Sequence, residues 1–275
     1  MLQNTLYSLL TVTSAFVVLA AGTSLAGETV PEGAKPWPEL SKDGVHAHVG
    51  ENTLWLQVDK VASQAGRVVI PRLCASIRSV VWCQHPDALV KVAPEPNEWI
   101  FSWKPKGEED ALLKIRLDTQ PLLPVDCPIA TPNGDGSVML HAYQANTFGE
   151  KLRFEPQWYK NTVGYWAVAT DYATWKLKLD APGTYSVAVL QGCGSGQGGS
   201  DAKLTLSQAD KVEAEVSFQT IDTGHFQNFR WNHLGFVTVT TAGEYELRIA
   251  PVKIAKGALF DVRTIHLVKQ ATAAQ

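Results

Sequence analysis

Short apolar runs separated by turn residues fill the first half of the chain from residue 45 onward. Each run is rich in Val, Ile, Leu or Trp, and together they cover residues 53–58, 67–70, 77–82, 90–92, 99–103 and 112–117. The breaks between them contain Gly, Pro, Asn or charged residues. Apolar segments of this length and spacing are typical of strands in an antiparallel sandwich. No run shows the apolar stripe of a long helix.

The second half alternates more regularly between apolar and polar positions. Apolar residues occupy every second position in 185–189, 204–206, 212–216 and 245–249. Alternation with a period of two indicates strands with one face in the core and one face in solvent. The sequence therefore predicts an all-β protein built from two antiparallel β-sandwich domains.

Changes in composition mark the boundaries between the predicted linkers and domains. Residues 27–44 are polar and proline-rich and are expected to be a linker, followed by an accessory β-sandwich over 45–124. A second proline-rich segment, which ends in Asn133-Gly-Asp-Gly136, predicts a linker over 125–137. The second sandwich is expected over 138–268, with a frayed tail at 269–275.

Residues 1–26 have the character of an export signal. They carry no charged side chain, and an apolar run from Leu6 to Ala21 precedes Ser24-Leu25-Ala26. This pattern predicts a signal peptide cleaved near Ala26, and an uncleaved anchor is the alternative because Lys and Arg are missing before the run. The run is short for a membrane span. We expect a secreted or periplasmic protein without a span in the mature chain.

Charge and cysteine content narrow the classes of partner. The 275 residues carry a formal net charge of −3, with no basic stripe of the kind that binds nucleic acid. Four cysteines in an exported chain permit one or two disulfides, and three full pairings of Cys74, Cys83, Cys127 and Cys193 stay open. Cys74 and Cys83 flank a predicted strand and could link its ends. Their spacing does not fit a zinc site.

Aromatic and amide side chains gather just before a strand in the second half. Asn161, Tyr165 and Trp166 precede the alternating run 175–179, whose first residue, Trp175, is expected in the core. A ring can cover the apolar face of a sugar while amides bond its hydroxyls, so these loop residues favour carbohydrate binding. The alternative is that the aromatics pack at the edge of the sandwich.

A second aromatic and amide segment covers residues 222–231 and is expected to be a long loop. It contains Phe226, Gln227 and Asn228, so it is the other candidate part of the sugar site. Asp222 and His225 could form a dyad, but no Ser or Cys nucleophile lies in an activated turn. Neither a catalytic metal nor a pair of catalytic carboxylates is indicated by spacing.

The run Gln191 to Ser200 contains Gly194, Gly196 and Gly199 at the spacing of a dinucleotide fingerprint. That motif needs a helix after it, because the helix N-terminus binds the pyrophosphate. A predicted strand over 202–206 follows instead. We therefore interpret the run as a loop between two strands.

These motifs resemble known families. Asn161 to Trp166, Asp171 to Trp175, the Thr223-Gly-His-Phe-Gln227 segment and Ala258-Leu-Phe-Asp261 together resemble family 6-like carbohydrate-binding modules over residues 136–268. The resemblance implies a galactose-binding-like jelly roll in which Tyr165 and Phe226 are the two rings that enclose a sugar. Leu259 stands where the family often has a ligand-binding Asn.

The same resemblance bears on cofactors. The family often has a structural calcium held by a Glu after an Ala in the first strand, but Tyr143 follows Ala142 here. Asp261 alone would not supply the six to eight oxygen ligands that calcium takes. No cofactor is therefore expected, although a structural calcium is left open.

The first domain resembles the C-terminal β-sandwich of bacterial α-L-fucosidases, through 54–59, 66–71 and 77–82. The catalytic barrel of those enzymes has no counterpart in this sequence. The expected function is non-catalytic binding of a polysaccharide or glycan by Asn161, Tyr165, Trp166, Phe226, Gln227 and Asn228. The alternatives are a cell-envelope scaffold that binds protein and a cryptic glycoside hydrolase.

Overall fold

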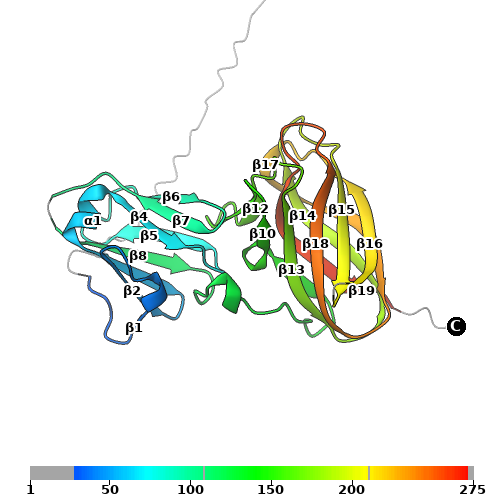
Figure 1. Cartoon of the computed structure of the whole chain (residues 1–275), viewed down its shortest axis with the longest axis horizontal. Helices are drawn as coiled ribbons and strands as arrows, with labels where there is room; N and C mark the ends of the chain where they lie inside the picture. The colour runs from blue at the N-terminus through cyan, green and yellow to red at the C-terminus, as the bar shows by residue number, and fades with distance from the viewer. Residues whose placement is uncertain (1–27, 108, 210, 272–275) are drawn as a thin grey trace, which may run out of the picture.

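The computed structural model describes residues 28–107, 109–209 and 211–271. Regular structure in these ranges is almost entirely β, which confirms the predicted fold class (Figure 1). The helical parts are α1 (Lys60–Ala65) and the short 3-10 turns η1 (Pro38–Leu40), η2 (Pro124–Asp126) and η3 (Ala142–Gln144). Within the described ranges, no helix has the length and hydropathy that a membrane span requires. The predicted signal peptide lies outside these residues.

The first half of the chain forms two antiparallel sheets around a shared core. One has the order β1 (Lys35–Pro36), β2 (Val45–Gly50), β3 (Thr53–Val58), β8 (Ala111–Leu117) and β5 (Ile77–Trp82). The other has the order β4 (Arg67–Pro71), β7 (Glu98–Ser102) and β6 (Lys91–Pro94). Leu54, Leu56, Trp82, Trp99 and Phe101 are fully buried between them.

Part of the linker expected over residues 27–44 packs against the first sheet. Lys35 and Pro36 form β1 and pair with Val49 and His48 of β2. Leu40, at the end of η1, is 1% exposed and belongs to the core. The apolar side chain of Leu40 needs burial, and its removal from water ties the proline-rich segment to the first sheet.

The second half contains two larger sheets (Figure 1). One runs β10 (Asn146–Phe148), β13 (Tyr172–Leu179), β18 (Gly243–Lys253), β15 (Asp201–Gln208) and β16 (Lys211–Gln219). The other runs β11 (Arg153–Glu155), β12 (Thr162–Gly164), β19 (Asp261–Lys269), β14 (Gly183–Cys193) and β17 (His225–Val239), and β9 (Val138–His141) also pairs with β19.

Strand β13 shows why the alternating pattern produces this architecture. Trp175, Leu177 and Leu179 are fully buried, whereas Lys176 and Lys178 between them are exposed. The expectation that Trp175 is a core residue is confirmed. Its indole N–H is satisfied as well, because it donates to the backbone oxygen of His141 at 3.0 Å.

The expected long loop over residues 222–231 is wrong in its second part. β17 begins at His225 and pairs with β14 as far as Cys193, with register shifts after Val187 and near Gln191. The mixed pattern of polar and aromatic residues in this segment hides a strand whose two faces are both partly exposed. Phe226 and Gln227 therefore lie on the first residues of a strand.

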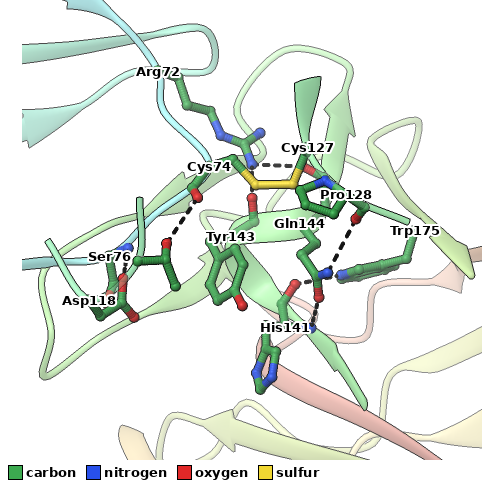
Figure 2. The surroundings of a disulfide bond; sticks show 12 residues. Arg72, Cys74, Ser76, Asp118, Cys127, Pro128, His141, Tyr143, Gln144 and Trp175 are labelled. Carbon is green, nitrogen blue, oxygen red and sulfur yellow. Dashed lines mark hydrogen bonds between the residues drawn. A yellow bond between two sulfur atoms is a disulfide. The ribbon is translucent and has the colours of Figure 1, made fainter. Parts of the chain in front are cut away.

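The junction between the two halves is covalently closed by a disulfide between Cys74 and Cys127 (Figure 2). The suggested link from Cys74 to Cys83 is wrong, since Cys83 and Cys193 are buried free thiols. Beside the disulfide, the buried guanidinium of Arg72 donates to the backbone oxygens of Tyr143 at 3.1 Å and Ala145 at 2.7 Å. These bonds join the first sandwich to η3 of the second.

The segment that follows β11 is also held by the first sandwich. Ile77 forms an isolated parallel bridge with Gln157, whose side-chain amide donates to the backbone oxygen of Val92 at 2.9 Å. Arg153 on β11 forms an ion pair with Glu95, with 2.7 Å between Nη1 and Oε2. β11 and the turn after it are thus fixed from both halves of the chain.

Candidate functional site

A pocket of about 310 Å³ opens where several strands of the six-stranded sheet begin or end. Its lining comes from β11, the turn before β12, the residues after β12, and the first residues of β17 and β19. The lining residues are Glu155, Lys160, Tyr165, Trp166, Ala167, Phe226, Gln227, Ala258 and Asp261. Three segments far apart in sequence therefore meet at one concave site.

The pocket brings together four of the six residues expected to bind sugar: Tyr165, Trp166, Phe226 and Gln227. Asn161 and Asn228 are not among its lining residues. Glu155, Lys160 and Asp261 line the pocket but were not expected there as binding residues. Asp261 belongs to the closing motif that carries the family resemblance, whereas Glu155 and Lys160 gave no sequence signal beyond their closeness to Asn161.

Tyr165 presents a half-exposed ring at the mouth of the pocket. The residue is 51% exposed, and its backbone has a φ of 60°, in the left-handed region that aromatic residues rarely adopt. The guanidinium carbon of Arg153 lies 4.5 Å from the ring centroid. Such unusual backbone geometry persists only where the surroundings enforce it and is enriched at binding sites.

Phe226 is placed by a close approach to the glycine-rich run. A Cβ atom at Gly194 would lie only 2.7 Å from Cε2 of the Phe226 ring, so a larger residue at this position would displace the ring. Since β15 follows this run, no helix N-terminus is available for a pyrophosphate. Within this site, the absence of a side chain at Gly194 leaves space for the Phe226 ring.

Trp166 is corrected from an open stacking residue to a core residue. It is 1% exposed, and its ring stacks on Phe260 with centroids 5.6 Å apart. Its indole N–H donates to the backbone oxygen of Asp171 at 2.8 Å. Because Trp166 is buried, it contributes to the pocket wall without an open ring face.

The two asparagines have structural environments of their own. The side-chain nitrogen of Asn228 donates to the backbone oxygen of Thr223, which stabilises the turn before β17. Asn161 has a φ of 44°, and its side-chain oxygen is buried without a hydrogen-bond partner among the described residues. Neither amide is directed to sugar hydroxyls by the contacts that the structure shows.

The charged residues of the pocket lining, here called its polar floor, are two carboxyl groups and one ammonium. Glu155 is 3% exposed and forms an ion pair with Lys160. Asp261 is 5% exposed, and no hydrogen bond to its carboxyl group is found among the described residues. A Cβ atom at Gly164 would lie 2.6 Å from Oε2 of Glu155 and 2.8 Å from Oδ1 of Asp261, so the two carboxyl groups are close neighbours.

This arrangement shifts the pKa values of two floor residues, Asp261 and Lys160. Burial raises the pKa of Asp261 well above its usual range, and the negative charge of Glu155 adds to the effect, against a smaller opposing effect of Lys160. Burial lowers the pKa of Lys160, but its hydrogen bond and charge interaction with Glu155 outweigh this, so that pKa is raised. The floor thus holds an ion pair beside a carboxyl group that favours its neutral form.

A larger groove of about 650 Å³ lies over the outer face of β13, β18, β15 and β16. It is lined mainly by charged and small polar residues, among them Lys176, Lys203, Glu246 and Arg248. The one aromatic residue in its lining, Tyr245, is 3% exposed and offers no open ring face. The smaller pocket is therefore the better match to stacking on a sugar, despite its volume.

The possible dyad of Asp222 and His225 is not formed by the contacts of these two residues in the structure. Asp222 accepts hydrogen bonds from the amides of Gly224 at 2.7 Å and Gly196 at 2.5 Å, while Nδ1 of His225 accepts from the amide of Gln227. Asp222 therefore stabilises turns and shows no bond to His225 within the described residues. In the same residues, no group of three or more His, Cys, Asp or Glu side chains could hold a metal ion.

No family model and no curated protein matches the chain. Among solved structures, an α-L-fucosidase from Vibrio sp. strain EJY3 is similar over 86% of this chain, with 11% identity and a TM-score of 0.35. This chain spans 42% of that enzyme.

Two carbohydrate-binding modules are also similar. A family 35 module from Clostridium thermocellum covers 49% of this chain and 98% of its own length, with 12% identity and a TM-score of 0.37. The C-terminal family 6 module of a laminarinase from Zobellia galactanivorans covers 48% of this chain and 99% of its own, with 17% identity and a TM-score of 0.39. Both classes that the sequence motifs resemble are thus found among the similar structures.

Proposed function

We propose that this protein binds carbohydrate without cleaving it, at the pocket between Tyr165 and Phe226. The observation that carries the proposal is the half-exposed residue Tyr165, with Arg153 over its ring, in a pocket whose lining also includes Phe226 and the charged residues of the polar floor. Aromatic faces provide apolar contact to the C–H surface of a pyranose, and a few polar groups fix its orientation. Gln227, which lines the pocket, is the amide that would contact a sugar hydroxyl.

The resemblance to carbohydrate-binding modules supports the same proposal. We further propose that the chain is exported and that its mature form begins near Ala26. The first sandwich has an accessory role in this proposal, since it supplies Glu95 to hold Arg153 beneath Tyr165. The ligand class is a polysaccharide or glycan.

A glycan array with the mature chain tests the proposal directly. We expect at least one glycan to bind, and the double variant Tyr165→Ala with Phe226→Ala to lose the signal by more than tenfold. The double variant Trp231→Ala with Phe236→Ala is the matched control, since these aromatics are 49% and 56% exposed on β17 but lie outside the pocket. Circular dichroism establishes that both variants keep their fold.

Two results would redirect the assignment. Equal binding by the pocket variant and the control variant would refute the site. A blank array from folded protein would favour the alternative function, a scaffold that binds protein, because Trp231, Phe236 and Val268 leave an apolar surface exposed on β17 and β19. Release of reducing sugars from any glycan that binds would overturn the non-catalytic part of the proposal.

A further inference from the structure

Asp261 is the floor residue whose hydrogen-bonding capacity is left unused by the protein. It is 5% exposed, lines the pocket, and has no bonded partner for its carboxyl group among the described residues. Its oxygens are not among the fully enclosed side-chain atoms that lack a partner, so a water or a ligand in the pocket can reach them. The neighbouring Glu155 differs, because it is paired with Lys160.

Position and surroundings both favour an uncharged carboxyl group. Asp261 is the first residue of β19, and the pairing of Val262 with Val163 places it next to Gly164 at the pocket floor. Glu155 on β11 and Lys160 in the following turn are the charged groups that face it, and the buried thiol of Cys193 is a further titratable neighbour. Since Lys160 is committed to Glu155, a charged Asp261 would add an unbalanced negative charge.

We propose that Asp261 is a specificity-determining residue that donates a hydrogen bond from its protonated carboxyl group to an oxygen of an uncharged sugar. The inference rests on the proposed function and goes beyond it by naming the ligand class. A neutral carboxyl group has one donor and can also accept, which matches a sugar hydroxyl. A uronic acid would bring a carboxylate next to the negative charge of Glu155, where like charges repel.

Burial and the charge of Glu155 support this assignment, because both raise the pKa of Asp261 and so favour the protonated carboxyl group. Ligand binding removes water from the pocket and strengthens the same preference. The proton stays on Asp261 throughout, so the step involves binding and no proton transfer.

Two substitutions at one position separate the neutral acid from a carboxylate. Asp261→Asn keeps the shape of the side chain, a donor group and an acceptor. Asp261→Leu keeps a branched shape but has neither a donor nor an acceptor. Binding is measured near pH 7 by calorimetry with neutral β-glucan, mannan, xylan, galactan and fucosylated oligosaccharides, and with oligogalacturonate as the anionic counterpart. We expect Asp261→Asn to remain within about threefold of the parent and Asp261→Leu to lose tenfold or more.

The protonation state is measured without reference to binding strength. The carboxyl carbon of Asp261 has a different NMR shift in its neutral and ionised forms, and a titration of the full mature chain with and without sugar follows it. We expect the neutral shift near pH 7, both free and bound. The chain should bind neutral oligosaccharides and not oligogalacturonate.

The outcomes divide between the two proposals. Binding that is unchanged in Asp261→Leu, equal losses in both variants, an ionised carboxyl group in the complex, or preference for oligogalacturonate would each overturn the role of Asp261 alone. Failure of every oligosaccharide to bind folded protein would overturn the proposed function and this inference with it.

Discussion

The guanidinium carbon of Arg153 lies 4.5 Å from the centroid of the Tyr165 ring. The same guanidinium donates to Glu95 at 2.7 Å and to the backbone oxygen of Pro94 at 2.9 Å, both in the first sandwich. The position of the Tyr165 ring in the second sandwich therefore depends on contacts made by the first. A cation held over a ring contributes about 0.5–2 kcal/mol, depending on its exposure to water.

Arg153→Leu is expected to weaken glycan binding by about three- to tenfold, which corresponds to about 1 kcal/mol. The reason is that the Tyr165 ring loses the group that holds one of its faces. Isothermal titration measures the change. Arg248→Leu is the matched control, because Arg248 lies over the ring of Tyr172, at 3.8 Å from its centroid, outside the pocket. Equal loss in both variants would contradict the assigned role of Arg153.

Gly194→Ala is expected to reduce glycan affinity while leaving thermal stability nearly unchanged. The new Cβ would come within 2.7 Å of the Phe226 ring, and a side chain on the pocket edge can rotate away at low cost. Affinity by titration and the melting temperature by calorimetry are measured together. Gly134→Ala, where no heavy atom lies within 4 Å of the added Cβ, is the control. Unchanged affinity in Gly194→Ala would show that Phe226 does not contact the ligand.

Asp171→Asn is expected to destabilise the fold by about 1–3 kcal/mol. The buried carboxyl group of Asp171 accepts hydrogen bonds from the backbone amides of Glu150, Lys151 and Leu152 at 2.8–3.0 Å. An amide replaces one accepting oxygen with a donor, which leaves at least one of these N–H groups unpaired. Urea unfolding gives the change in free energy. Asp180→Asn, which alters an exposed ion pair with Lys178, is expected to have little effect.

The sequence predicts much of the fold because the strands of a β-sandwich produce a local pattern of apolar and polar residues. The alternation from Trp175 to Leu179 requires only that every second side chain points to the core, and the structure confirms it. The burial of Trp166 could not be predicted from the local pattern. Trp166 follows the left-handed residue Tyr165, so no period fixes its direction, and its ring is covered by Phe260 from a distant part of the chain.

The polar floor could not be read from the sequence for a related reason. Glu155 and Asp261 come together through the pairing of β11 with β12 and of β12 with β19. That register is a long-range property, and each residue alone resembles an ordinary charge at a strand end. No local sequence pattern indicates that Gly164 leaves room for both carboxyl groups.

Asp261→Asn is expected to change how stability depends on pH. The pKa of Asp261 is raised in the folded state, so the folded protein binds more protons than the unfolded chain above the unfolded value of about 3.9. The parent protein should therefore lose stability relative to Asp261→Asn as pH rises from about 4 towards neutral. Urea unfolding of both proteins across this range gives the free energy of unfolding of the parent minus that of the variant. This difference should fall as pH rises, and a constant or rising value would contradict the prediction.

Breaking the disulfide is expected to destabilise the protein by up to about 4 kcal/mol. Cys74 and Cys127 are 53 residues apart, and a cross-link over a loop of this length restricts the unfolded chain by about that free energy. Unfolding of the parent protein is compared with and without reductant. The double variant Cys74→Ser with Cys127→Ser should match the reduced parent and show no response to reductant. A response in this variant would point to the buried thiols instead.

The support that Glu95 and Val92 provide to residues 153–157 has a consequence for modularity. A binding domain that is shuffled between proteins must carry its own scaffold, since its neighbours change. Here β11 and the turn after it contribute Glu155 and Lys160 to the pocket, and both are held by contacts with the preceding sandwich. The pocket in this structure therefore involves both sandwiches, and a fragment with only the second is expected to lack the contacts that hold β11 and the turn after it.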